Sequence, residues 1–257
     1  MVAIDINSDL GEGYGAYRVT EDEALLDVVS SANIACGLHA GDPEIMAHTF
    51  RVAKAKGVAV GAHPGFPDLW GFGRRRIPFS TGEIERLIAY QIGAAQGLAT
   101  YAGHRITYVK THGALGNIAE EDAEVARAVL RAVKAVDPAL VILAGPYGEQ
   151  TTAAASMGLR AVAEIYADRG YTEEGRLIPR GQPNAMILDP DAAAGRVIAM
   201  TTAGAIVTAA GTHLPTEIKS VCVHGDSSHA VATAKLLRSK LESSGFTIEP
   251  FSSRISS

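Results

Sequence analysis

The sequence predicts an α/β fold, a distorted (β/α) barrel of about seven parallel strands in one domain that covers residues 1–257. Short apolar runs alternate with longer amphipathic stretches, which is typical of a parallel sheet whose strands are joined by helices. Polar, glycine-rich loops follow the first four runs and the last two. An open sheet would carry site residues at only a few strand ends, so this distribution favours a closed barrel with its site at one end.

Seven segments are predicted as strands because each is short and either apolar throughout or alternating in polarity. They are residues 3–7, 31–35, 58–62, 106–110, 140–144, 161–166 and 220–223. Alternation along the first strand places Asp5, Asn7 and Asp9 on one side, which predicts polar side chains inside the barrel.

The helices between these strands have marked beginnings and ends. Asp42 and Asp189 are each followed by proline, the pattern of an N-cap with proline at the first helical position. Ser80 and Glu83 have capping-box spacing before a helix that reaches roughly Ala102. Glycines that follow amphipathic segments mark helix ends at positions 57, 158 and 245.

Two stretches interrupt the alternation of strands and helices. Residues 167–186 are polar and rich in Arg, Gly and Pro, and an irregular loop of this length in a compact enzyme is usually functional. Residues 204–218 are expected to form a small hairpin before the last strand. No linker, repeat or low-complexity segment divides the chain, which agrees with a single domain.

Composition excludes several classes of protein. The net charge is −5 and no basic run is longer than Arg74 to Arg76, so nucleic acid is not an expected partner. No apolar stretch approaches 18 residues and no signal peptide is apparent, so we expect a cytoplasmic protein without membrane partners. Cys36 and Cys222 lie in apolar contexts and are interpreted as buried thiols.

The first strand and the loop after it supply Asn7, Asp9 and Glu12 as candidate site residues. A buried carboxylate needs a cation, a metal ion or hydrogen-bond donors, because it is too costly to bury alone. Asp9 and Glu12 are therefore candidates for catalysis. The alternative is that they cap the turn that follows.

Histidines follow the second and third strands, at His39 and His63, in glycine-rich loops. With Asp9 they form a candidate metal set of two histidines and one carboxylate. The helical HExxH spacing that would make a metal site more specific is absent. A purely structural role for the two histidines is the alternative, and Asp42 is interpreted as the helix cap already described.

Lys110 and His112 lie at the end of the fourth strand, two residues apart and so on the same side. The lysine can offer a positive charge to a phosphate or polarise a carbonyl group. The histidine can serve as an acid or base because its ordinary pKa is near neutrality. The alternative for Lys110 is a solvated position at the rim of the sheet.

The later loops add further candidates for binding a substrate or a phosphate. Asp168, Arg169 and Arg180 lie in the irregular segment, where arginine suits carboxylate or phosphate oxygens and an exposed salt bridge is the alternative. His224 and Asp226 follow the last strand. The chain has no P-loop, no strand-linked GxGxxG and no GxSxG. A nucleotide would therefore bind through another kind of surface or on another subunit.

These motifs resemble the LamB/YcsF family over nearly the whole chain. The motifs that carry the resemblance are NSDLGE at 7–12, SANIACGLHAGD at 31–42, GAHPG at 61–65, GFGRR at 71–75, VKTHGAL at 109–115, EIYADR at 164–169 and VHGD at 223–226. The family usually has Cys in place of Ser8, Pro in place of Thr111 and Tyr in place of Gly116. The last difference is expected to enlarge the pocket or loosen its loop.

The resemblance implies a glycoside hydrolase/deacetylase-like barrel. It also implies ATP-dependent opening of 5-oxoproline to L-glutamate, together with 5-oxoprolinase subunits B and C. A five-membered lactam is a poor electrophile, and phosphorylation of its carbonyl oxygen by ATP would create a good leaving group. On this hypothesis Lys110, with Arg169 or Arg180, binds the phosphate or the substrate carboxylate. The residues that would position or deprotonate water are Asp9, Glu12, His39, His63 and His112.

Three functions remain as alternatives at this point. The chain is one component of an ATP-dependent lactam hydrolase, with ATP bound here or with the partner subunits; or it is a metal-dependent hydrolase that acts alone; or it binds substrate while its partners carry out the chemistry.

Overall fold

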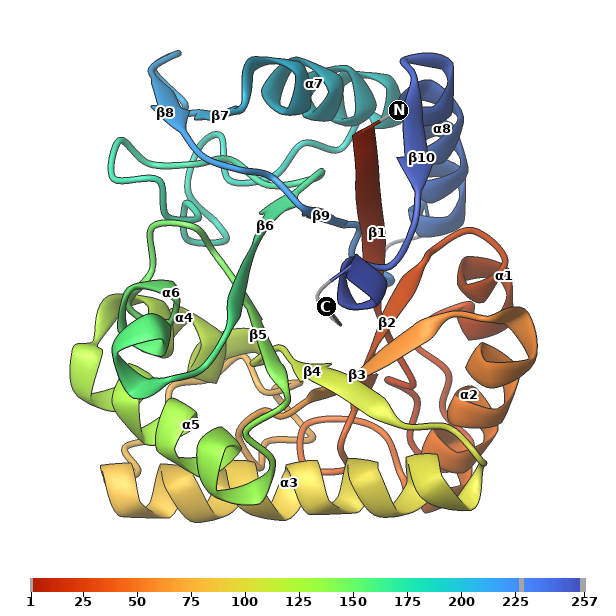
Figure 1. Cartoon of the computed structure of the whole chain (residues 1–257), viewed down its shortest axis with the longest axis vertical. Helices are drawn as coiled ribbons and strands as arrows, with labels where there is room; N and C mark the ends of the chain where they lie inside the picture. The colour runs from red at the N-terminus through yellow and green to blue at the C-terminus, as the bar shows by residue number, and fades with distance from the viewer. Residues whose placement is uncertain (1, 227–228, 255–257) are drawn as a thin grey trace.

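Seven parallel strands close into a barrel in the computed structural model, which describes residues 2–226 and 229–254 (Figure 1). The seven strands are β1 (Val2–Leu10), β2 (Ser31–Ala35), β3 (Ala59–His63), β4 (Ile106–Val109), β5 (Val141–Ala144), β6 (Ala161–Tyr166) and β9 (Ser220–Cys222). Pairing of β1 with β9 closes the ring. The predicted seven-stranded (β/α) barrel is thus confirmed: two strands have the predicted bounds, and the ends of the others differ by at most three residues.

The first strand is longer than predicted because it serves three neighbours. Its first residues pair with β10 (Phe246–Ile248), a strand that was not predicted and that lies outside the closed ring. Its middle pairs with β9 and its end with β2. Asp5, Asn7 and Asp9 are all buried and bond to side chains of other barrel strands, as alternation predicted.

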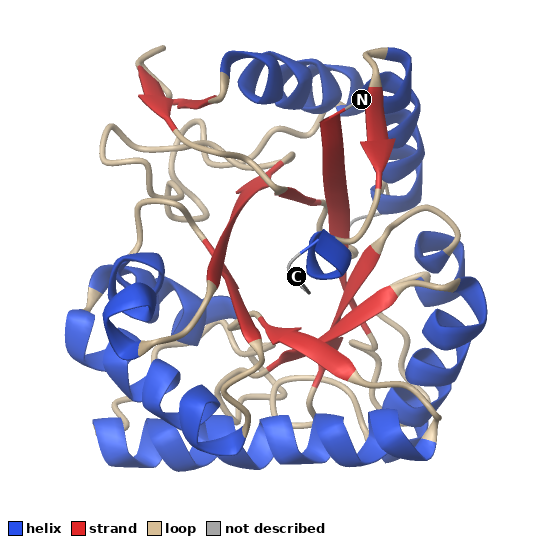
Figure 2. Cartoon of the chain, in the orientation of Figure 1, coloured by secondary structure: helices blue, strands red, loops and turns tan. Residues whose placement is uncertain are grey.

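Helices surround the barrel and cover its outer face (Figure 2). They are α1 (Asp22–Leu26), α2 (Pro43–Lys56), α3 (Thr81–Tyr101), α4 (Gly113–Glu121), α5 (Ala123–Val136), α6 (Glu149–Ala154), α7 (Pro190–Ala203) and α8 (Ala230–Ser243), with the 3-10 turn η1 (Ala155–Met157) after α6. The caps expected at Asp42 and Asp189 and the capping box at Ser80 and Glu83 are present. Within the described ranges, no helix has the length and apolar character needed to cross a membrane.

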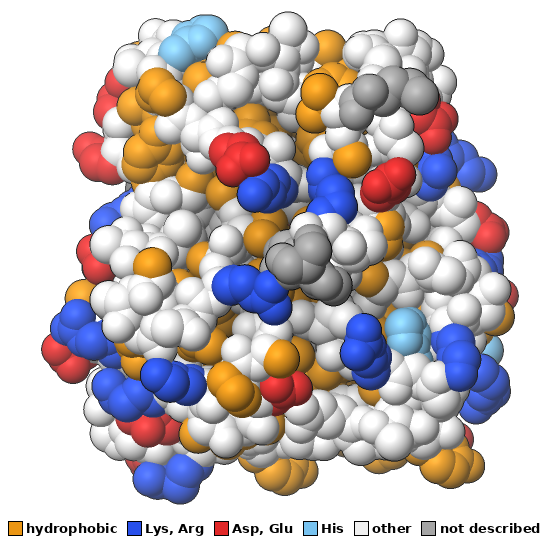
Figure 3. Space-filling model, in the orientation of Figure 1, with side chains coloured by type: hydrophobic (Ala, Val, Ile, Leu, Met, Phe, Trp, Pro, Cys, Tyr) orange, Lys and Arg blue, Asp and Glu red, His pale blue; other side chains and the backbone are white. Residues whose placement is uncertain are grey.

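A short 3-10 turn, η2 (Phe251–Arg254), closes the N-terminal end of the barrel. In Figure 1 this blue turn lies within the outline of the ring, on the side of β1 and β2. The Phe251 ring packs against Tyr108 at 5.0 Å between centroids, within a small apolar cluster that includes Val141 and Val162 near the start of their strands. On the face shown in Figure 3, hydrophobic, basic and acidic side chains are dispersed. The polar site lies at the other end.

The two irregular stretches also behave as predicted. Between β6 and α7 the chain forms neither helix nor strand, and it is held by isolated bridges between Arg169 and Met186 and between Tyr171 and Leu177. The expected hairpin is formed by β7 (Ala205–Val207) and β8 (His213–Pro215), which pair antiparallel.

Candidate active site

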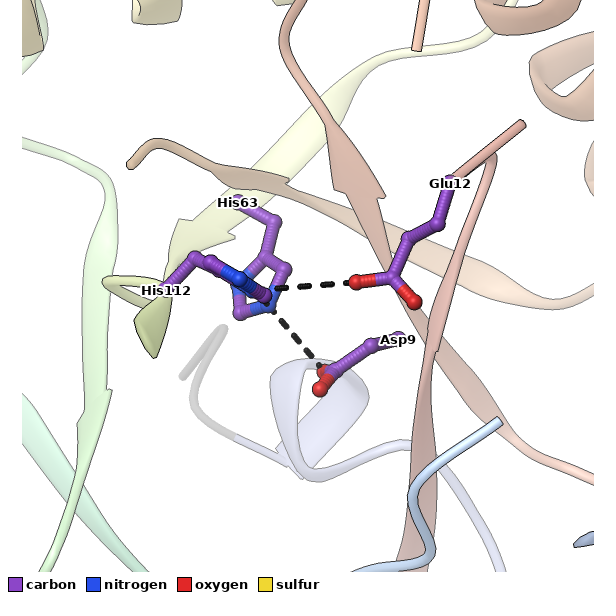
Figure 4. Close-up of side chains that lie close together, drawn as sticks. All are labelled: Asp9, Glu12, His63 and His112. Carbon is purple, nitrogen blue, oxygen red and sulfur yellow. Dashed lines mark hydrogen bonds and ion pairs between the residues drawn. The ribbon is translucent and has the colours of Figure 1, made fainter. Parts of the chain in front are cut away.

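Four buried side chains converge at the C-terminal end of the barrel (Figure 4). Asp9 comes from the end of β1, Glu12 from the loop after it, His63 from the end of β3, and His112 from the residue before α4. The His63 Nε2 atom lies 3.4 Å from Asp9 Oδ1, and His112 Nδ1 lies 3.6 Å from Glu12 Oε1. The barrel therefore brings together four residues that the sequence placed on three separate loops.

Backbone carbonyl groups fix the proton positions of the two histidines. His63 Nδ1 lies 2.7 Å from the Lys110 carbonyl oxygen, so it carries the proton and leaves Nε2 as a lone pair. His112 Nε2 lies 2.8 Å from the Phe72 carbonyl oxygen, so its Nδ1 is the unprotonated nitrogen. These two unprotonated nitrogens face each other at 3.0 Å. Two lone pairs that face each other repel, so this position attracts a proton or a cation.

The loop that supplies the Phe72 carbonyl has an unusual backbone. Phe72 has φ 54°, a left-handed conformation that is uncommon for a residue with a side chain. Gly73 follows at φ 65°, and a Cβ atom there would lie 2.8 Å from the Cβ of His39 and 2.9 Å from His112 Cδ2. Glycine at position 73 thus lets the loop approach closely enough to orient His112.

The four groups differ in their preferred charge. Burial opposes ionisation of Asp9, but His63 and Lys110 together hold the pKa of that carboxyl well below its usual value. Burial, reinforced by the nearby Asp9 charge, raises the pKa of Glu12 well above its usual value. Burial and the neighbouring His63 lower the pKa of His112 to about 3. In the absence of a cation the cluster therefore holds one carboxylate, one protonated carboxyl and a neutral His112.

The ammonium group of Lys110 is buried beside this cluster and already has several partners. Its Nζ atom lies 2.9 Å from Glu164 Oε2, 3.2 Å from Asn7 Oδ1, 3.1 Å from Cys222 Sγ and 3.5 Å from Asp9 Oδ1. Burial alone would lower the pKa of Lys110, but Asp9, Cys222 and Glu164 raise it well above its usual value. Lys110 is therefore a fixed positive charge that keeps Asp9 ionised.

The cluster fits a divalent metal ion. Each of the four residues offers a ligand atom, and these atoms lie within 4.8 Å of one another. Glu12 Oε1 is buried without a hydrogen-bond partner among the described residues, as expected of an atom that awaits a ligand. Two neutral imidazoles and two carboxyl groups suit zinc and similar transition metals.

His39 lies beside this cluster and outside it. Its ring stacks on His112 at 3.8 Å with 10° between the planes, and it meets His63 edge to face at 5.7 Å. Of the expected metal set, Asp9 and His63 belong to the cluster and His39 does not. Glu12 and His112 supply the other two ligand atoms. A second possible group consists of Asp9, Cys222 and His224.

The remaining candidates lie around the cluster in three different settings. His224 Nδ1 lies 2.9 Å from Asp168, and its ring stacks on Tyr166. Asp226 accepts a hydrogen bond from Arg74 at 2.5 Å. The others are two arginines of the irregular segment. Arg169 is buried and donates to the carbonyl oxygens of Ala185 and Ile178, and Arg180 is exposed, with its guanidinium 3.4 Å from the Met186 sulfur.

A cavity of about 410 Å³ opens beside the cluster, a volume suited to a small ligand. Asp9, His63, Lys110 and His112 line this cavity. Its lining also includes residues that the sequence did not single out, chiefly Glu120, Gln150 and Arg176. Glu120 was missed because a glutamate in an amphipathic helix is usually a surface residue. Gly116 also lines the cavity.

Comparison with known proteins identifies close relatives. The model of the LamB/YcsF family matches residues 4–256. A protein of Azorhizobium caulinodans, named as the A subunit of 5-oxoprolinase, is 70% identical over 98% of this chain and 99% of its own length. One of the same name from Gluconobacter oxydans is 54% identical over 95% of this chain and 96% of its own length.

Solved structures confirm the barrel fold. The lactam utilization protein from Thermus thermophilus superposes with a TM-score of 0.92 at 40% identity, over 97% of this chain and all of that one. The catalytic domain of a peptidoglycan N-acetylglucosamine deacetylase from Eubacterium rectale has a TM-score of 0.51 at 10% identity, over 96% of this chain and 87% of that one. The second comparison shows a shared deacetylase-like barrel fold only.

Proposed function

Because the chain belongs to the LamB/YcsF family, we propose that it hydrolyses the lactam ring of 5-oxo-L-proline to L-glutamate. The observation that carries this proposal is the pair of unprotonated nitrogens of His63 and His112, which face each other beside the Asp9 carboxylate. This arrangement can take a proton from a water molecule and hold it next to an anion. It adjoins a cavity of suitable size for a small cyclic amide.

The reaction needs an acceptor for the water proton and a donor for the ring nitrogen. Water forms a C–O bond to the lactam carbonyl carbon, the ring C–N bond breaks, and the nitrogen leaves as an amine after it takes a proton. The His63–His112 pair can accept the first proton and then donate it to the ring nitrogen, and Asp9 stabilises the imidazolium formed in between. Lys110 keeps Asp9 ionised throughout, because its ammonium is held within the barrel.

We propose that ATP activates the lactam. Transfer of the γ-phosphoryl group to the lactam carbonyl oxygen would give ADP and a phosphorylated intermediate. Attack by one water molecule would then break the ring C–N bond and leave an acyl phosphate, and a second water molecule would release the phosphate to give glutamate. The chain lacks a P-loop, and Lys110 is already bonded to Glu164 and Asn7, so a nucleotide is best accommodated with partner subunits B and C. The relatives, each named as one subunit of 5-oxoprolinase, support an assembly of several subunits.

A second candidate function, a metal-dependent hydrolase that acts alone, is favoured by the four-residue cluster. A divalent ion held by Asp9, Glu12, His63 and His112 would act as a Lewis acid and lower the pKa of a bound water. Stoichiometric metal in the purified protein, together with amide hydrolysis that needs neither ATP nor partners, would support this alternative.

The proposed function is tested by glutamate formation from 5-oxoproline and ATP in the presence of subunits B and C. Lys110→Met and Asp9→Asn are expected to abolish glutamate formation, whereas Arg127→Met, on the exposed face of α5, should leave it unchanged. Thermal melts of all three variants show whether they are folded. Full activity in folded Asp9→Asn would contradict the assigned chemistry and favour a binding role.

A further inference from the structure

Part of the cavity lining forms a polar network that the proposed hydrolysis does not use. Gln150, from α6, donates to Glu120 Oε1 at 2.9 Å and to the Thr111 hydroxyl at 3.2 Å. Arg176, from the irregular segment between β6 and α7, lines the same cavity. We call Glu120, Gln150 and Arg176 the distal wall.

Arg176 differs from the other cationic side chains of the cavity in its hydrogen bonding, and its charge lies close enough to Glu120 to oppose the rise in the pKa of that carboxyl. Its Nε atom is shielded from solvent and has no hydrogen-bond partner among the described residues. The other cations are engaged or exposed: Arg74 with Asp226, Arg76 with Glu121, Arg169 with two carbonyl oxygens, Lys110 with Glu164, and Arg180 in solvent. A desolvated guanidinium nitrogen without a partner is costly, so this position is suited to an anion from outside the chain.

Glu120 supplies an acceptor in the same wall. Its Oε1 atom accepts from Gln150, and within the described ranges no donor reaches Oε2. This carboxyl occupies the space that a side chain at position 148 would fill, since a Cβ atom on Gly148 would lie 1.1 Å from Oε2. Burial raises the pKa of Glu120 to about 7, although Gln150 lowers it in part.

We propose that the distal wall recognises the lactam substrate, with the Arg176 guanidinium binding its carboxylate and the Glu120 carboxyl accepting its ring N–H. This inference rests on the proposed lactam hydrolysis. A cyclic amide that carries a carboxylate offers one anion and one N–H donor, and the distal wall offers one cation and one free acceptor. With both ends of the ligand held there, the ring carbonyl is free to face Lys110, His63 and His112, which line the same cavity.

The test compares two ligands that differ only in the carboxylate, 5-oxoproline and 2-pyrrolidinone. Their binding to the full chain is measured by calorimetry or ligand-observed NMR, for wild type, Arg176→Met, Arg176→Lys and the exposed control Arg127→Met. Loss of a charge-assisted contact should weaken 5-oxoproline binding about 10- to 150-fold in Arg176→Met. Binding of 2-pyrrolidinone should be unchanged, and Arg176→Lys should recover part of the loss.

Glu120 is tested with a lactone in place of the lactam. Tetrahydrofuran-2-one-5-carboxylate keeps the carboxylate and the carbonyl group but lacks the N–H donor. Glu120→Ala should therefore weaken binding of 5-oxoproline and leave binding of the lactone unchanged.

Three results would overturn the proposal: no binding of 5-oxoproline by the wild type, undiminished binding by Arg176→Met, or equal loss of both ligands in that variant. The failure of the subsite is distinguishable from that of the reaction. Arg176-dependent binding without glutamate formation in the presence of the partners would contradict the proposed hydrolysis and support the proposed subsite. Glutamate formation by Arg176→Met with an unchanged KM for 5-oxoproline would contradict the proposed subsite and support the proposed hydrolysis.

Discussion

The four-residue cluster predicts that a divalent metal ion stabilises the folded protein and that Glu12 is required for this effect. Glu12 Oε1 is buried without a partner, and burial raises the pKa of this carboxyl. In the metal-free protein Glu12 is therefore protonated, and Glu12→Gln mimics that state at little cost in stability. In the metal-bound protein the same change removes a charged ligand, so the metal-dependent gain in stability should be lost.

The size of the effect follows from linkage between binding and folding. A metal ion at 100 times its dissociation constant stabilises the native state by about 2.7 kcal/mol. For a chain of this size, 1 kcal/mol corresponds to about 2–4 °C in melting temperature. The chelator-treated wild type should therefore gain about 5–11 °C on addition of Zn²⁺, and Glu12→Gln should gain almost nothing.

The assay is a set of thermal melts with and without chelator, with two matched controls. Glu124→Gln, at an exposed position on α5, should respond to metal like the wild type. His39→Gln should also keep most of the response, because His39 lies outside the cluster. A wild-type melt that does not change in millimolar Zn²⁺ would refute the reasoning. A response lost in His39→Gln but kept in Glu12→Gln would instead favour the ligand set that the sequence suggested.

Three further predictions concern the distal wall, the barrel interior and its closed end. Gly148→Ala should move the Glu120 carboxyl and so weaken 5-oxoproline binding. The thermal melt should be almost unchanged because φ −90° at this position permits alanine, and binding as in the wild type would contradict the prediction. The pKa of Asp5 is raised by burial to about 6, so the folded state holds its extra proton between about pH 4 and 6, and the stability it contributes is lost as pH rises through 6. Chemical denaturation should show the wild type losing on the order of 3 kcal/mol more than Asp5→Asn over that range, and parallel pH curves would refute the assignment. Phe251→Ala should cost about 3–5 kcal/mol in urea unfolding because it opens the cluster around Tyr108, and a loss below about 1 kcal/mol would show that η2 does not close the barrel.

The barrel was predictable because its signals are local. The strands are short apolar runs, and the caps at Asp42, Ser80 and Asp189 are fixed by two to four neighbouring residues. The closure of the sheet followed from the number of strand ends that carry polar loops. The strand β10 and the turn η2 were not predictable in this way, since their roles depend on contacts with β1 and Tyr108 at distant positions.

The site was only partly predictable because its details depend on side-chain direction. Spacing indicated that His39, His63 and His112 approach one another, but not which of them face Asp9. That selection depends on the carbonyl of Phe72, whose left-handed backbone has no clear signal in the sequence. Arg169 was expected to bind substrate, and the structure shows it bonded to the backbone of the irregular segment; its role in binding stays a prediction.

The central claim is that this chain opens a lactam with chemistry centred on Asp9, His63, His112 and Lys110. It is tested most directly by measuring glutamate and ADP released from 5-oxoproline and ATP, by the chain alone and with subunits B and C. We expect equal amounts of both products in the mixture only, and neither with folded Asp9→Asn in place of the wild type. Undiminished release with Asp9→Asn, or no release with all three subunits folded and associated, would contradict it.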